Sequence, residues 1–165
     1  MHRSFDQIPD HAKLWVFRTN ETLEGDYMNG LKTRLVSFME GWESHGSPVF
    51  ASFEIIEPHF LLVSAISADG NPSGCSTDKL VHFFEKEKET FQVDFLNNSD
   101  VFYLSNQAWS STHFSEIQEK IESGIIEPDT LLANLQVTKK GDYPSQWLIK
   151  AGDSWMKRNF ASVKS

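Results

Sequence analysis

Two neighbouring stretches, residues 49–57 and 59–67, constrain the fold of this chain more than any other feature. Side chains that favour strands alternate along both stretches, and only Pro58 separates them. Two strands joined so tightly pair as an antiparallel hairpin. One face of the expected sheet is fully apolar, whereas the other carries Ser52 and Glu54 among large apolar side chains. A mixed face of this kind indicates partial cover or a ligand surface.

Strand and helix patterns flank the hairpin on both sides. Residues 13–18 read as a strand, and residues 25–42 carry apolar side chains at helical spacing. After the hairpin, a second helix is expected from Cys75 to about residue 92, followed by a strand at 101–105. The order β-α-β-β-α-β predicts an α+β fold of the ferredoxin-like kind in residues 1–106, with both helices on one face of a four-stranded antiparallel sheet.

Residues 107–165 are expected to form a C-terminal α/β extension that covers the second face of this sheet. Ser110-Ser111-Thr112 should cap a short helix that ends at Gly124, and residues 131–137 read as a strand. Pro144 should begin another short helix that holds Trp147. No linker separates this region from the rest, and 165 residues are enough for one good core. The two parts should therefore form one compact domain.

Charge and composition exclude several classes of function. The formal net charge of −8 repels a phosphate backbone, so we expect no nucleic-acid partner. The longest apolar run, at residues 60–63, is far too short to cross a bilayer, and the first residues lack the apolar core of a signal peptide. A single cysteine excludes an internal disulfide. These features together predict a cytoplasmic protein without a membrane partner.

No motif for a metal or a nucleotide is present. The chain lacks CxxC, HExxH and a histidine cluster at metal-ligand spacing, so we expect no metal site. It also lacks the GxxxxGK[ST] phosphate loop, which excludes ATP hydrolysis of that type. We therefore expect no cofactor.

The most promising stretch for chemistry surrounds the only cysteine, where a loop becomes a helix. Ser76, Thr77 and Asp78 suit the first turn of a helix, so Cys75 should lie at or just outside its N-terminus. The free N–H groups there could hold a phosphate or a carboxylate. The candidate ligand-binding residues are Gly74, Cys75, Ser76, Thr77 and Asp78.

Two roles remain open for Cys75. A helix N-terminus favours the thiolate, so this residue is a candidate catalytic nucleophile. The alternative is a buried cysteine that only fills space in the core, which is the commoner use of a free cysteine. His82 lies about 10 Å away along the helix, so the helix alone does not bring it to Cys75 as a base. A base would have to come from elsewhere in the chain, such as His45, His59 or His113.

Several short stretches together resemble a family of small bacterial proteins of uncharacterised function. The resemblance rests on Leu14-Trp15-Val16-Phe17-Arg18, Trp42-Glu43-Ser44-His45-Gly46, Ser52-Phe53-Glu54, Ser73-Gly74-Cys75-Ser76 with Asp78, His82-Phe83, and Asp153-Ser154-Trp155. The family carries a Gly-Cys-Ser-x-Asp motif, in which x tends to be apolar, whereas here it is Thr77. Its members are sometimes labelled ABC-transporter ATPases, a label that the missing phosphate loop does not support. The resemblance implies no catalytic residue.

A second resemblance covers residues 113–147. Phe114, Ile117, Ile121, Gly124-Ile125, Pro128-Asp129-Thr130-Leu131 and Trp147 are similar to the helix–Gly–strand unit of GYF-like peptide-binding modules. The Gly-Tyr-Phe triplet of those modules is missing.

Three functions are compatible with these observations. The first is a module that binds a small ligand, an anion among the candidates, or a protein partner at the helix start around Cys75. The second is a thiol-dependent enzyme with Cys75 as the nucleophile, which needs a base beside the sulfur and an open cleft. The third is a structural or assembly protein that forms a homodimer through the open face of its sheet. We favour the first, because no convincing catalytic motif is present.

Overall fold

The chain folds into two compact units that both combine helices with antiparallel sheet. The structure is a computed structural model that describes residues 1–56 and 58–163. Unit 1 comprises Met1–Asn97 and Leu135–Tyr143, and unit 2 comprises Asn98–Asn134 and Pro144–Ser165. This division differs from the boundary at residue 106 expected from the sequence. Each unit is made of two separate segments, because residues 135–143 belong to unit 1 although they lie between the two segments of unit 2 in the chain.

The sheet of unit 1 has the strand order β1-β4-β3-β2. Its strands are β1 (Lys13–Arg18), β2 (Glu43–Ser44), β3 (Ser47–Ile56) and β4 (Phe60–Ser67). The hairpin prediction is confirmed, because β3 and β4 pair antiparallel from Val49–Ser67 to Ile56–Phe60. Residues 43–48 form a second and smaller hairpin, which the sequence pattern did not predict. Its turn residues His45 and Gly46 have φ of 51° and 77°, as a two-residue turn with matching twist requires.

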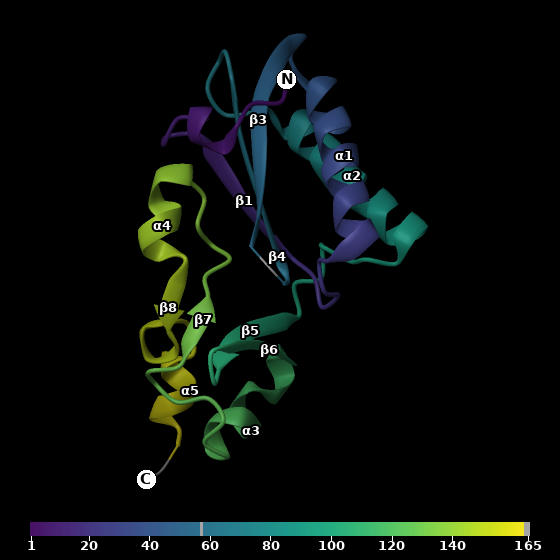
Figure 1. Cartoon of the computed structure of the whole chain (residues 1–165). Helices are drawn as coiled ribbons and strands as arrows, with labels where there is room; N and C mark the ends of the chain where they lie inside the picture. Colours follow the sequence, from purple (N-terminus) through teal and green to yellow (C-terminus); the bar gives the residue numbers. More distant parts are fainter. Residues whose placement is uncertain (57, 164–165) are drawn as a thin grey trace. The chain divides into compact units, whose positions relative to one another are not determined.

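Two long helices pack on one face of this sheet (Figure 1). Helix α1 spans Gly25–Glu40 and α2 spans Gly74–Phe91. The apolar stripe of α1 meets the odd-numbered side chains of β3 and the buried side of α2. Their shared core consists of Phe17, Leu23, Leu31, Leu35, Met39, Trp42, Val49, Ala51, Leu61, Val63, Ala65, Leu80, Phe84, Val93 and Phe95. Both predicted helices are therefore confirmed, each within two residues of its expected end.

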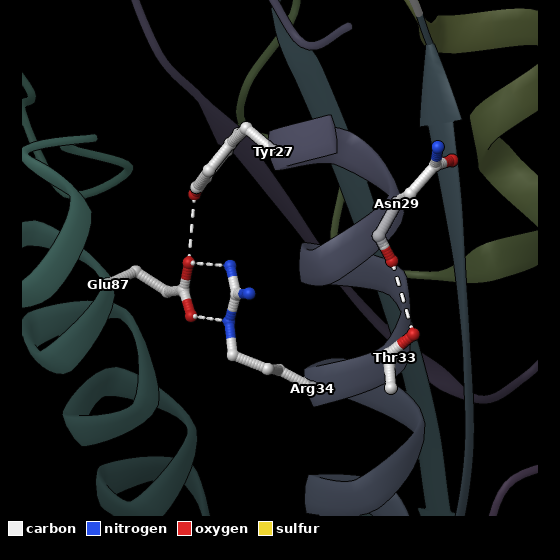
Figure 2. Close-up of polar contacts among 5 residues, drawn as sticks. All are labelled: Tyr27, Asn29, Thr33, Arg34 and Glu87. Carbon is white, nitrogen blue, oxygen red and sulfur yellow. Dashed lines mark hydrogen bonds and ion pairs between the residues drawn. The ribbon is translucent and has the colours of Figure 1, made fainter. Parts of the chain in front are cut away.

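A polar cluster connects the two helices beside this core. Glu87 of α2 accepts two hydrogen bonds from the Arg34 guanidinium of α1, at 2.6 Å and 2.8 Å, and a third from the Tyr27 hydroxyl at 2.9 Å (Figure 2). The Arg34 guanidinium also lies 3.9 Å from the centre of the Phe91 ring. Glu87 belongs to the charged run 85–89, which suggests a solvated face, yet only 3% of its side chain is exposed.

The other face of the unit 1 sheet carries the even-numbered residues of β3, among them Phe50, Ser52 and the exposed Glu54. At the edge of this sheet, β1 lies beside the segment at 138–139, where the backbone N–H of Leu14 donates to the Thr138 carbonyl at 2.8 Å. The side chains of Leu14, Val16 and Leu62 face away from the helices, and they are buried all the same. The homodimer expected through the open face of the sheet stays a prediction.

Unit 2 holds a second antiparallel sheet, in the order β6-β5-β7-β8. Its strands are β5 (Asp100–Ser105), β6 (Ala108–His113), β7 (Leu131–Ala133) and β8 (Leu148–Lys150). The short helices of this region are α3 (Ile117–Glu122), α4 (Tyr143–Gln146) and α5 (Lys157–Ala161). A small separate core is formed by Tyr103, Ile117, Ile121, Ile126, Leu132, Ala151 and Met156.

The ferredoxin-like topology is not confirmed, although the α+β class is. In that topology the fourth strand joins the first sheet beside β1, whereas here β5 pairs with β6 and β7 in unit 2. Residues 108–113 supply the reason, because the expected helix cap at Ser110-Ser111-Thr112 is in fact part of β6. A strand only two residues after β5 pairs with it as a hairpin, and this local partner is closer in the chain than β1.

Two further expectations for the C-terminal region need correction. The expected strand at 131–137 is limited to Leu131–Ala133, and the short helix at Pro144 ends at Gln146, so that Leu148–Lys150 forms β8. The expected end of the preceding helix at Gly124 is confirmed, since this residue has a φ of 76° and follows Ser123, the C-cap residue of α3. Within the described residues, no helix combines the length and the apolar character needed to cross a membrane.

Candidate functional site

The start of α2 is anchored by serine hydroxyls rather than by apolar packing alone. Ser73 is the N-cap residue, and its Oγ accepts the Ser76 N–H at 3.2 Å. The helix therefore begins at Gly74, one residue before the start expected at Cys75. Ser73 suits this position because its extended backbone lets the side chain reach back to the first turn.

The β2–β3 hairpin holds this helix start from the other side. The Ser73 N–H donates to Ser44 Oγ at 3.1 Å, and Ser76 Oγ donates to the Glu43 carbonyl at 2.8 Å. The indole N–H of the buried Trp42 donates to the Ser76 carbonyl at 2.9 Å. Two stretches that lie about thirty residues apart are thus joined by three hydrogen bonds, and both belong to the family resemblance drawn from the sequence.

Although these hydrogen bonds hold the start of α2, Gly74 and Cys75 lie at the surface. Both residues are exposed, as is Asp78, whereas Ser76 is buried and Thr77 lies between these extremes. The Thr77 hydroxyl turns back to the Ser73 carbonyl at 3.1 Å, so it does not point freely to solvent. Within the described part of the chain, the backbone N–H groups of Gly74 and Cys75 have no hydrogen-bond acceptor. These are the first donors of a helix, which always lack partners inside the helix itself.

The surroundings of Cys75 decide between its two expected roles. The side chain is exposed, so the alternative of a buried packing cysteine is wrong. Among the described residues, however, no histidine or carboxylate lies within hydrogen-bond reach of its sulfur. The three candidate bases are elsewhere: His45 is in the β2–β3 turn, the ring of His59 bonds to the Glu21 carbonyl, and the ring of His113 bonds to Ser115. The residues that the structure describes do not supply a catalytic pair at this site.

The described residues do not offer a metal site. No group of three or more His, Cys, Asp or Glu side chains there is arranged to hold a metal ion. The Ser44 and Ser73 contacts were missed by sequence reasoning, although Trp42-Glu43-Ser44 and Ser73-Gly74 both stood out within the resemblance. We found no match to this chain among protein-family models, curated proteins or solved structures.

Proposed function

We propose that this chain is a binding module whose α2 N-terminus, residues 74–78, takes an anionic group of a small ligand or of a partner protein. One observation carries the proposal: the exposed N–H groups of Gly74 and Cys75 are held in place by the Ser44–Ser73 and Glu43–Ser76 hydrogen bonds and have no acceptor of their own within the described residues. A helix start that is rigid and open in this way suits an anion, because the N–H groups and the helix dipole act together.

Binding is better supported than thiol catalysis at this site. A nucleophilic cysteine needs a base within about 3 Å, and Cys75 has none among the described residues. The exposed free thiol persists best in a reducing compartment, which supports a cytoplasmic location as part of this proposal.

A matched pair of substitutions at one position tests the proposal. Gly74→Pro removes one N–H donor at the first helical residue, where proline is well tolerated, and Ser73 already has the extended conformation that precedes a proline. Gly74→Ala keeps the donor, and its methyl group meets nothing within 4 Å. The probe is inorganic phosphate, titrated into ¹⁵N-labelled protein up to about 20 mM, a range that covers millimolar affinity.

We expect saturable shifts of the amide signals of residue 74 and Cys75 in the wild-type protein and in Gly74→Ala. In Gly74→Pro the affinity judged from the Cys75 signal should fall about five-fold, which is the effect of about 1 kcal/mol. Wild-type amide signals that do not move with phosphate, or equal affinities of the proline and alanine variants, would contradict the proposal.

A second candidate is peptide binding by unit 2, and exposed apolar side chains favour it. Phe114 and Trp155 are 58% and 56% exposed, and Ile125 and Leu148 are also exposed. Aromatic side chains at a surface are typical of modules that bind extended peptides. Titration with a synthetic proline-rich peptide should shift the signals of unit 2 in wild-type protein and much less in Phe114→Ala. Equal shifts in both proteins would exclude Phe114 from such a surface.

A further inference from the structure

A hollow of about 320 Å³ opens on the face of the unit 1 sheet that points away from α1 and α2. Its lining comes from three places in the chain: the first residues, the short helix η1 (Phe5–Gln7) with the turn after it, and strands β3 and β4. The lining residues are Arg3, Gln7, Ile8, Pro9, Phe50 and Ile66. Phe50 and Ile66 lie directly opposite each other in the β3–β4 register, so their side chains form a continuous apolar floor.

Arg3 places a positive charge at this apolar floor. Its backbone N–H donates to the Ala51 carbonyl at 2.9 Å, which fixes the segment along the edge of β3. The guanidinium carbon lies 5.3 Å from the centre of the Phe50 ring. Within the described residues the guanidinium makes no ion pair and no hydrogen bond, even though the chain carries 23 acidic residues.

Gln7 adds a second donor to the same lining. Its Oε1 accepts the Ser4 N–H at 3.3 Å, an arrangement that assigns the other end of the amide as the NH₂ group. Among the described residues this NH₂ group has no acceptor. The nearby Lys140 is different, because its ammonium group already lies 3.8 Å from an Asp10 carboxylate oxygen and over the Phe5 ring. Arg3 and Gln7 therefore remain as the donors of the hollow that lack an acceptor.

We propose that this hollow binds a small monocarboxylate with a short apolar tail. A carboxylate matches the Arg3 guanidinium and the Gln7 NH₂ group, both of which donate only. The tail matches Ile8, Pro9, Phe50 and Ile66, which are apolar. The volume lies at the lower end of the range of ligand pockets, so it suits a ligand of a few carbon atoms rather than a large cofactor. This site is independent of the α2 N-terminus.

Three ligands of equal length separate charge recognition from apolar burial. Hexanoate, 1-hexanol and hexylammonium are titrated up to about 50 mM, which covers weak affinity, while the methyl signals of Ile8 and Ile66 are followed by NMR. Hexanoate should produce saturable shifts and bind at least about five-fold more tightly than 1-hexanol, and hexylammonium should not bind. Equal binding of all three, or the absence of saturable shifts with hexanoate, overturns the proposal.

Substitutions then test the residues themselves. Arg3→Gln removes the charge from an exposed side chain and should weaken hexanoate binding about five-fold or more, while leaving 1-hexanol unaffected. The matched control is Arg158→Gln, an exposed arginine of α5 in unit 2, which should change neither. Ile66→Trp fills the hollow and should abolish the binding of both hexanoate and 1-hexanol. If Arg3→Gln still binds 1-hexanol and its affinity for hexanoate is unchanged, the assigned role of Arg3 is overturned.

Discussion

Removal of the Arg34 side chain is expected to be the most damaging single change to the polar cluster between α1 and α2. In Arg34→Met, Glu87 loses two hydrogen bonds and its counter-charge, and only the Tyr27 hydroxyl remains as a partner. Loss of one partner of a buried pair costs about 3–5 kcal/mol. For Arg34→Met we expect the free energy of unfolding to fall by about 3 kcal/mol, at the lower end of this range. Arg34 is 31% exposed, so its loss admits water to a carboxylate that is otherwise 3% exposed.

The reverse substitution should cost less, because the two partners differ in burial. In Glu87→Met the partly exposed Arg34 can turn to solvent, so the loss should be about 1.5 kcal/mol, mainly from the Tyr27 hydroxyl and the lost pair. The double variant should cost about 2 kcal/mol, less than the sum of the single changes, because no buried charge is left without a partner. The coupling energy of this cycle is then about 2.5 kcal/mol.

Urea unfolding measures these free energies in unit 1 alone when the amide signals of Leu35 and Leu80 are followed by NMR. Lys32→Met is the control, since Lys32 is an exposed residue of the same helix and its replacement should change stability by less than about 0.5 kcal/mol. Equal losses in Arg34→Met and Glu87→Met, or a coupling energy near zero, would refute the argument from unequal burial.

Three further predictions concern other parts of unit 1. Burial and the neighbouring Glu87 raise the pKa of Tyr27 above its ordinary value, so the contribution of Tyr27 to stability is present below about pH 10 and is lost as the pH rises further. In urea unfolding, Tyr27→Phe should therefore lose less stability than the wild type as the pH becomes alkaline. Parallel curves of stability against pH for the two proteins would contradict this. Leu35→Ala should lower the free energy of unfolding by about 3 kcal/mol because Leu35 is fully buried, and a loss under about 1 kcal/mol would place it outside the core. The exposed Cys75 should react with Ellman's reagent in the folded protein at a rate within about ten-fold of that in concentrated urea, whereas a far slower reaction would mean that the sulfur is covered.

The elements of unit 1 were predictable because each has a strong local pattern. Alternation in β3 and β4, the single proline between them and the 3.6-residue stripe of α1 do not depend on distant parts of the chain. The same holds for the position of Gly74 and Cys75 at a helix start. The N-cap residue itself was not identified, because both Ser73 and Ser76 satisfy the sequence rule, and only the contact with Ser44 shows which one is used.

Residues of the second unit were harder to predict because their patterns are short and ambiguous. Ser110-Ser111-Thr112 suits a helix cap as well as a strand, and its place in β6 is decided by pairing with β5. Pairing also explains the strand at Leu148–Lys150, which is only three residues long and pairs with β7. Such short strands carry little propensity of their own and form where a partner strand is available.

By itself, the sequence determined the α+β class, the β3–β4 hairpin, the two long helices and the position of the single cysteine at the beginning of α2. Only the tertiary structure decided that β5 joins a second sheet, that Glu87 in a charged run is buried against Arg34, and that Arg3 and Gln7 share one hollow. The physical reason is range: periodicity and capping act within one turn or one strand, whereas burial, ion pairing and strand partners depend on residues far apart in the chain.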